Sequence, residues 1–417
     1  MALNNAFTLT ANEIYETLAN MIISQEVFAD NLGEHQTLVD KARVDGGLYG
    51  DTKLYYATDV LKSHDWLNDQ EAANLLAIER PQDPEVQAIK LDVFKQIRLT
   101  LDNYLTKRAW MNEGAFSSFN GVMLGWMRET KRVYDGTLYN VFIGTTASSV
   151  GKQAQEIELP AGGTEANDKQ RAMLIARGLA DLFVQMSDYN RDFNDYGYFR
   201  SYAKDGIKVI WNSKFVNEIR KVDLPTIFHK DGLVDKFEED VLAPRYFGVV
   251  LTSSNLKNYA AATAYSAGDL IQDTTGHKVY RVTEDIAAGS NSALSDVKKV
   301  ELVVRSMVEK DIGGGSGTAS AGTAAQHVFP GDLAPSGFSI AASDATFKYG
   351  EAYVEDPDVI CKIVVKLPPF MSAFEVGTTF FNPRSLTENH YLTFGHNSLA
   401  YLKNYPFITV KAKAKAE

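Results

Sequence analysis

The chain has 417 residues, of which 45% are hydrophobic and 23% are charged, and its formal net charge is −11. This composition is that of a folded protein and excludes a chain that is disordered over most of its length. The negative charge argues against a protein whose task is to grip phosphate backbones. At this length we expect two or three structural units.

The sequence also limits the compartment and the chemistry. No apolar run approaches the roughly 20 residues that a membrane-spanning helix needs, and the N-terminus lacks the basic and apolar regions of a secretory signal. The single cysteine, Cys361, excludes an intramolecular disulfide and a multi-cysteine zinc site. We therefore expect a protein that folds in a reducing cytoplasm, with Cys361 buried among the apolar residues of VICKIVVKL.

The first predicted element is a helix close to the N-terminus. Thr10 and Glu13 fit a capping box, and Ile14, Leu18 and Ile22 follow at helical spacing. The apolar stripe of such a helix must lie on something else, either its own domain or another region or subunit.

A polar segment with glycine and proline turn markers follows, from Gly33 to Pro84. It nevertheless contains four large apolar residues. Such residues would be out of place on a free loop but not on a loop that rests on an adjacent subunit. These candidate intersubunit contacts are Trp66, Leu75, Leu76 and Ile78.

A two-faced strand and one long helix occupy the region between Val86 and Thr146. In VQAIKLDVFKQIRLTL, apolar and polar residues alternate, as in a strand with one buried face. After a basic corner, Asn112 is a predicted N-cap, and the apolar residues beyond it recur close to helical spacing. A helix of roughly 30 residues is about 45 Å long. We place Phe119, Met123 and Trp126 on its buried stripe.

This passage resembles the step from the extended loop into the spine helix of tailed-bacteriophage major capsid proteins, the Hong Kong 97-like fold that encapsulins share. The order of the other regions agrees, and Asp205–Leu233 is similar to part of an A-domain. The resemblance implies an α+β fold. Because the N-arm of that family lies along a neighbouring region or subunit, the resemblance also makes Ile14, Leu18 and Ile22 candidate intersubunit contacts. The expected parts of the fold are an N-arm (1–42), an E-loop (43–85), the P-domain strand and spine helix (86–160), an A-domain (161–250), an inserted β-rich surface domain (251–326), an A-domain return (327–350) and closing P-domain strands (351–417).

Within the expected A-domain, Thr164 begins a helix whose apolar side carries Met173, Phe183 and Val184. The helix ends in an acidic, aromatic run, SDYNRDFNDYGYF. Its carboxylates and amides crowd together as in a cation-binding loop, but Phe193 and Phe199 stand where such a loop needs glycine and glutamate. A divalent ion, a capped turn and a loop that faces a neighbouring subunit are the alternatives.

The expected insertion changes composition toward small and polar residues. The piece AYSAGDLIQDTTGHKVYRVTEDIAAG resembles small three-stranded carbohydrate-binding-like modules, although the exposed tryptophan pair of such modules is absent. We take Tyr265 and Tyr280 as candidate surface aromatics and expect at least one of them to pack in the core. The flexible run Gly313–Gly322 is expected to close the insertion.

No catalytic, cofactor-binding or metal-ligating set emerges from the sequence. Gly151-Lys152 lacks the preceding glycine and the following serine or threonine of a phosphate-binding loop. The histidines include no pair at i, i+4, and His390 and His396 lie six apart. There is no G-x-S-x-G elbow. We therefore expect neither an enzyme nor a cofactor.

We interpret the chain as a structural major capsid protein. It is expected to assemble as pentamers and hexamers into the icosahedral head shell around the double-stranded DNA of a tailed phage. Expected partners are other copies of itself, a scaffolding protein, the portal and head decoration proteins, without a membrane or sequence-specific DNA binding. The expected location is the virion, after assembly in the host cytoplasm. The alternatives are an encapsulin-like compartment and a carbohydrate-binding or carbohydrate-active protein.

Overall fold

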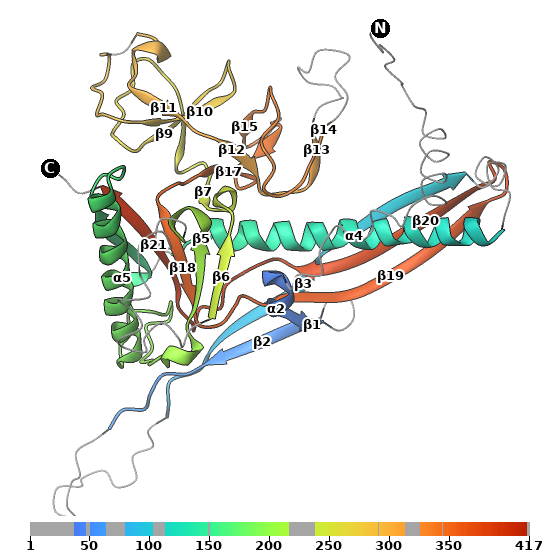
Figure 1. Cartoon of the computed structure of the whole chain (residues 1–417), viewed down its shortest axis with the longest axis horizontal. Coiled ribbons are helices and arrows are strands. Elements are labelled where there is room, and N and C mark those ends of the chain that lie inside the picture. Colours follow the sequence, from blue (N-terminus) through green and yellow to red (C-terminus); the bar gives the residue numbers. More distant parts are fainter. Residues whose placement is uncertain are drawn as a thin grey trace, which may run out of the picture. The chain divides into compact units, whose positions relative to one another are not determined.

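The structure is a computed structural model that describes residues 37–46, 51–63, 80–102, 113–148, 151–216, 238–290, 292–312, 326–343 and 345–414. The chain divides into two compact units (Figure 1). Unit 1 comprises Met1–Lys53, Ile89–Gly136 and Pro369–Ser398. Unit 2 comprises Leu54–Ala88, Thr137–Pro368 and Leu399–Glu417.

A five-stranded sheet, whose strands β1, β19 and β20 belong to unit 1, has the strand order β1-β19-β20-β3-β2. The long strands β19, β20 and β3 lie side by side and antiparallel, whereas β1 is short and parallel to the beginning of β19 (Figure 1). The alternation of buried and exposed residues predicted for β3 is confirmed, since Ile89, Leu91 and Leu101 are buried and Lys90 and Arg98 are exposed. The bounds are β1 Arg43–Asp45, β2 Thr52–Ala57, β3 Glu85–Asp102, β19 Phe370–Asn382 and β20 Thr387–Asn397, with the short helix α2 at Leu38–Ala42.

The long helix predicted after Asn112 is present as α4, Glu113–Thr145, with 33 residues. In the part that belongs to unit 1, Met127, Lys131 and Tyr134 are buried at helical spacing. The ammonium group of Lys131 contacts the buried Asp135 carboxylate at 3.2 Å. Paired in this way, the two charged side chains can share the buried side of the helix with apolar residues.

The prediction that Trp126 lies on the buried stripe of this helix is wrong. Trp126 is 42% exposed, whereas its neighbour Met127 is 5% exposed. The buried side is turned by one residue, because it includes Lys131 and Asp135, which a hydrophobicity pattern assigns to the solvent side. The side chains of Phe119 and Met123 lie outside the part of the chain whose side chains are described.

Unit 2 contains a second five-stranded sheet, ordered β4-β21-β18-β5-β6. All six residues of the central strand β18 are buried, including Cys361, as the sequence predicted. The helix α5, Glu165–Ser187, begins where predicted, and the Thr164 side chain accepts a hydrogen bond from the backbone N–H of Asn167. The strand bounds are β4 Ala154–Leu159, β5 Lys208–Asn212, β6 Glu238–Leu242, β18 Val359–Val364 and β21 Phe407–Ala414.

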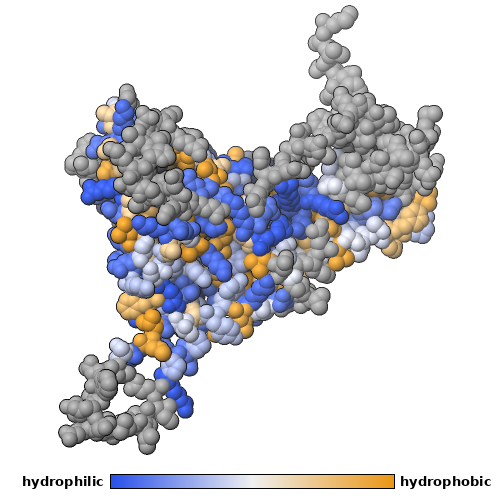
Figure 2. Space-filling view, turned by 60° about the horizontal axis from the view of Figure 1, so that its bottom comes forward, coloured by the Kyte–Doolittle hydropathy of each residue, from blue (hydrophilic) through white to orange (hydrophobic). Residues whose placement is uncertain are grey.

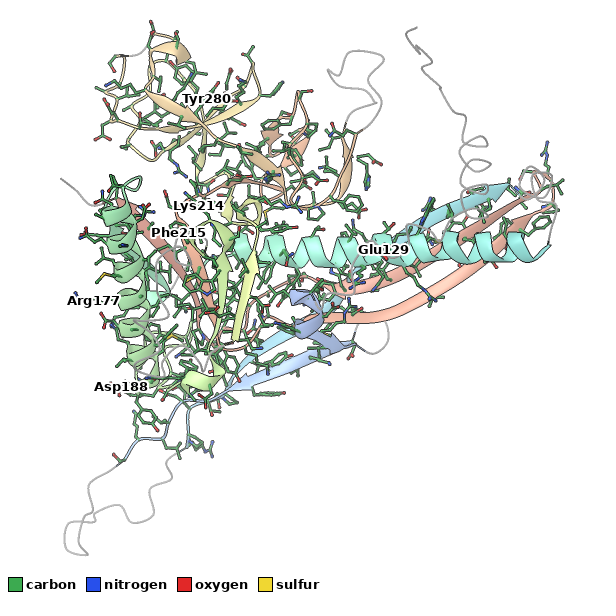
Figure 3. The ribbon with its side chains drawn as sticks, viewed as in Figure 1. Glu129, Arg177, Asp188, Lys214, Phe215 and Tyr280 are labelled. Carbon is green, nitrogen blue, oxygen red and sulfur yellow. The ribbon has the colours of Figure 1, made fainter. Side chains whose placement is uncertain are left out.

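The buried side of α5 differs in part from the predicted one. Ile175, Leu179 and Phe183 pack in the main core of unit 2. Met173 and Val184 are instead 54% and 57% exposed, and their spacing places them on the same side of the helix as Arg177, which is labelled in Figure 3. The helix therefore buries a narrower stripe than its apolar residues suggest.

The rest of unit 2 consists of short strands. The strand β17 pairs with β7 on one side and β12 on the other, β13 pairs with β14, and β15 pairs with β16. The bounds are β7 Gly248–Val250, β12 Val304–Ser306, β13 Lys310–Ile312, β14 Gln326–Val328, β15 Ile340–Ala341, β16 Phe347–Lys348 and β17 Ala352–Glu355. Single 3-10 turns span Gly151–Gln153, Lys204–Gly206, Pro244–Tyr246 and Leu294–Asp296.

A separate four-stranded sheet, ordered β11-β10-β9-β8, lies within the range expected for the insertion. Its strands have the bounds β8 Leu256–Asn258, β9 Leu270–Asp273, β10 Lys278–Val282 and β11 Lys299–Glu301. The expected range ends later, at residue 326, but β12 already pairs with β17 outside this sheet. The Gly313–Gly322 run lies outside the described residues and stands between the paired strands β13 and β14. It therefore connects a hairpin instead of closing the insertion.

Among the described residues, no helix has the length and apolarity to cross a membrane.

Candidate assembly surfaces

A segment within the predicted E-loop and a segment directly after it are held by specific contacts within unit 2. We call residues 54–61 the loop root and residues 188–200, which include the acidic aromatic run, the support loop. The Asp59 carboxylate accepts hydrogen bonds from the Arg191 guanidinium at 2.7 Å and from the backbone N–H of Phe199 at 3.0 Å. The carbonyl oxygen of Thr58 accepts a third bond, from Arg200, at 2.6 Å.

The electrostatics of this contact favour a charged Asp59. Partial burial by itself raises the pKa of this carboxyl, but the N–H groups of Phe199 and Val60 and the Arg191 guanidinium together hold the pKa below its ordinary value. The Arg191 guanidinium also lies over the Phe199 ring, 4.0 Å from its centroid. At neutral pH the loop root is thus held by the ion pair between Asp59 and Arg191. Each of these two side chains also contacts Phe199.

The support loop is itself tied to the body of unit 2. The buried Asn194 side chain bonds to both the N–H and the carbonyl oxygen of Tyr198, which closes the turn. The Asp195 carboxylate accepts hydrogen bonds from Ser148 at 3.1 Å, from Gln153 at 2.8 Å and from the Tyr401 hydroxyl at 2.6 Å. These bonds join segments that are far apart in the sequence, so the loop can act as a rigid support.

The segment directly after the predicted E-loop has a comparable anchor. The Gln87 side-chain amide donates to the carbonyl oxygen of Tyr401 at 2.8 Å, and its oxygen accepts from the N–H of Lys403 at 3.0 Å. Residues 401–403 also receive the support loop, because the Asp195 N–H donates to the carbonyl oxygen of Lys403. Both segments therefore attach to one small region of unit 2.

The loop root itself is apolar and uncovered. Leu54, Tyr56, Val60 and Leu61 are 50%, 65%, 59% and 76% exposed. Figure 2 shows hydrophobic surface next to the grey segment at its lower left. Adjacent exposed side chains of this size on an anchored segment are typical of a surface that meets another protein.

None of the seven predicted intersubunit contact residues belongs to the part of the chain that the structure describes. Ile14, Leu18, Ile22, Trp66, Leu75, Leu76 and Ile78 lie outside the described residues. Sequence reasoning did not find Asp59, Arg191 or Val60, because the contacts between the loop root and the support loop join residues more than 100 positions apart. The acidic, aromatic composition of the support loop was the only signal in the sequence.

The two candidate surface aromatics have different environments. Tyr265 is 2% exposed, and its hydroxyl accepts a hydrogen bond from the backbone N–H of Ala260 at 2.7 Å. It belongs to the core of the small sheet, as expected for at least one of the pair. Tyr280 is half-buried on β10 (Figure 3), with the Lys299 ammonium group 4.2 Å from its ring centroid.

The residues weighed for chemistry are either buried or engaged in contacts with other parts of the fold. Lys152, from the rejected phosphate-loop motif, forms a 2.7 Å ion pair with Asp192 of the support loop. His390 and His396 are both buried on β20, and His396 contacts the Tyr134 hydroxyl at 2.9 Å. Burial raises the pKa of the Cys361 thiol, so the thiolate is disfavoured. Within the described part of the chain, no group of three or more His, Cys, Asp or Glu side chains is arranged to hold a metal ion.

Comparison with known proteins identifies the class. The family model of Phi29-like phage major capsid proteins matches residues 2–410. The chain therefore belongs to the Phi29-like phage major capsid proteins. No curated protein matches the chain.

One solved capsid structure supports the fold, and two others are similar with lower scores. The capsid structure of Staphylococcus phage Andhra is similar with a TM-score of 0.54 at 9% identity, over 93% of this chain and 87% of that chain. A structure of the head fiber and inner core protein gp22 of bacteriophage P68 has a TM-score of 0.49 at 9% identity, over 91% of this chain and 87% of that chain. The capsid structure of the cyanophage P-SCSP1u has a TM-score of 0.42 at 8% identity, over 95% of this chain and 94% of that chain.

The protein is thus a major capsid protein of tailed phages that forms the head shell, with a mixed α/β fold of the Hong Kong 97-like class. Its family is structural and not enzymatic. Neither the encapsulin-like compartment nor the carbohydrate-directed function finds support in these comparisons.

Proposed function

We propose that the chain forms pentamers and hexamers that close into an icosahedral shell around double-stranded DNA, with the E-loop and the N-arm overlapping neighbouring subunits. Many weak contacts of this kind add up to a stable shell, because each subunit is held by several neighbours at once. The net charge of −11 helps densely packed DNA to stay unattached to the shell protein. Assembly takes place in the host cytoplasm, with a scaffolding protein, a portal and head decoration proteins as partners.

The observation that carries this proposal is the loop root. Its backbone is held in place by Asp59 and Thr58, yet Val60 and Leu61 point into solvent. Holding the root in place lowers the entropy that the loop loses on docking, so a fixed direction with an uncovered apolar surface suits a segment that binds an adjacent subunit. A loop that only connected two strands of one domain would need neither feature.

The test is a double substitution, Val60→Lys with Leu61→Lys. Both side chains are exposed in the subunit, so we expect the variant to fold and melt like the parent but to assemble into shells at least tenfold less efficiently. Val300→Lys is the matched control, because Val300 is 53% exposed on β11 and outside the loop root. Shells of normal yield from the double variant would rule out the loop root as a subunit contact.

A further inference from the structure

One long edge of the unit 1 sheet is open. The strand β19 pairs with β1 only through Phe370–Ser372, and its other side pairs with β20 as far as Asn382. β19 therefore has one edge that pairs with β20 and an opposite edge that pairs with β1 only at its start. Among the described residues, this opposite edge has no strand partner over residues 373–382. The backbone N–H and C=O groups on this side are available to another strand.

The open edge is also uncovered on both faces of the sheet. Every residue from Val376 to Phe381 is exposed, and the two phenylalanines at the end, Phe380 and Phe381, are 59% and 48% exposed. The opposite strand differs, because His390 and Leu392 of β20 are buried. The side chains are therefore exposed along the β19 edge but not along the neighbouring strand β20.

The sequence of the edge does not prevent pairing. Residues 376–381 read VGTTFF, with high β-propensity, no charge and no proline. Natural proteins protect open edges with lysine, proline or bulges. The one bulge here lies between Ala373 and Val376, before the exposed stretch. An edge of this kind is an aggregation risk in a protein that remains a monomer, and a binding site in one that assembles.

We propose that this edge pairs with the same edge of a second copy in the head shell, antiparallel and about a two-fold axis at Thr379. The surroundings of a shell subunit are other copies, and a two-fold contact brings identical surfaces together. In this register Thr378 lies opposite Phe380 and Gly377 opposite Phe381. Pairs of aromatic with β-branched residues, and of aromatic residues with glycine, stabilise sheets, and no like charges meet.

The proposal goes beyond the overlap of E-loops and N-arms, because it assigns a main-chain contact to described residues of unit 1. A cysteine at the axis provides a direct test. Residues directly opposite in an antiparallel pair have Cα atoms about 4.5–5.5 Å apart, within the range of a disulfide. The native Cys361 is fully buried, so an introduced thiol reacts against a low background.

We expect oxidised shells of Thr379→Cys to yield disulfide-linked dimers in more than half of the subunits, and the unassembled protein to yield almost none. Ser295→Cys, an exposed position in the 3-10 turn that precedes β11 in unit 2, is the matched control and should give no dimer in either state. Absence of the dimer from Thr379→Cys shells, or equal dimer from both variants, would overturn the pairing.

A second variant covers the case in which the cysteine disturbs assembly. Thr378→Lys with Phe380→Lys places charges on an exposed edge, so the subunit should melt like the parent while the shell yield falls at least tenfold. Normal shells from this variant would also overturn the pairing. The native chain is assembled in parallel, and its failure to form shells would count against the proposed function and not against the edge contact alone.

Discussion

The ammonium group of Lys362 donates a hydrogen bond to the carbonyl oxygen of Thr146, the residue that follows α4, over 2.7 Å. It donates a second bond to the Thr409 hydroxyl at 2.8 Å. Carbonyl groups at the carboxyl end of a helix carry partial negative charge and attract a cation. Burial nevertheless lowers the pKa of Lys362 to about 7, with a further contribution from Lys411, so the side chain is only partly charged at neutral pH.

This pKa predicts a pH dependence of stability. Between pH 7 and the ordinary lysine pKa near 10.4, the unfolded chain binds a proton that the folded chain does not, so stability rises with pH. From pH 7 to pH 9 the native chain should gain about 2 kcal/mol in free energy of unfolding relative to Lys362→Met. Urea denaturation of both proteins at the two pH values measures this difference. Parallel pH profiles would show that Lys362 keeps its ordinary pKa.

Two glycines of α4 give a matched pair for packing. A Cβ on Gly144 would lie 2.0 Å from the carbonyl oxygen of Tyr246, whereas a Cβ on Gly136 would meet nothing within 4 Å. Gly144→Ala should therefore destabilise the fold by about 3 kcal/mol or more through overpacking. Gly136→Ala should stabilise it by up to about 1 kcal/mol through helix propensity. Thermal melts of the two variants provide the test, and similar shifts would contradict the close approach at Gly144.

Because Trp126 faces outward, its substitution should affect stability less than the substitution of a buried residue of the same helix. Trp126→Asp should leave the melting temperature of the subunit nearly unchanged, because the side chain is 42% exposed. Met127→Asp should destabilise by several kcal/mol, since it buries a charge without a partner. Differential scanning calorimetry of both variants distinguishes the two sides of the helix. A large loss of stability in Trp126→Asp would mean that this face is buried after all.

The anchor at Asp59 should control access to the loop root. Asp59→Ala removes the acceptor for Arg191 and for the Phe199 N–H, so trypsin should cut at the exposed Lys62 several times faster than in the parent. Asp205→Ala, at an exposed aspartate on a 3-10 turn of the same unit, serves as the control. Equal cleavage rates for the two variants would show that the anchor does not restrain the root.

The small sheet of unit 2 can be tested by replacement. The strands β7 and β12 flank β17, so Val250 and Val304 stand two strand spacings apart, about 10 Å, which a short Gly/Ser linker can span. Replacing residues 252–302 should leave the ability to form shells of normal diameter. The melting temperature should fall, because Leu256, Leu270 and Val279 of the replaced segment pack against residues that remain. A folded variant that no longer assembles would make this segment a lattice contact.

The sequence predicts the elements whose pattern repeats along the chain. The alternation in β3 and the length of α4 follow from periodic burial, and the start of α5 follows from the cap at Thr164. The position of Trp126 could not be predicted, because the buried side of α4 includes the paired Lys131 and Asp135. The Asp59–Arg191 contact left no signal beyond the acidic, aromatic composition of the support loop. The Gly313–Gly322 run has a flexible composition, which does not indicate that the strands before and after it pair.

Electron cryo-microscopy of the assembled protein, alone or with a scaffolding protein, tests the central claim most directly. The account predicts closed shells in which Val60 and Leu61 of each loop root contact an adjacent subunit while Asp59 keeps its bond to Arg191 within its own subunit. Shells in which the loop root contacts only its own subunit, or a protein that forms no shell under either condition, would contradict it.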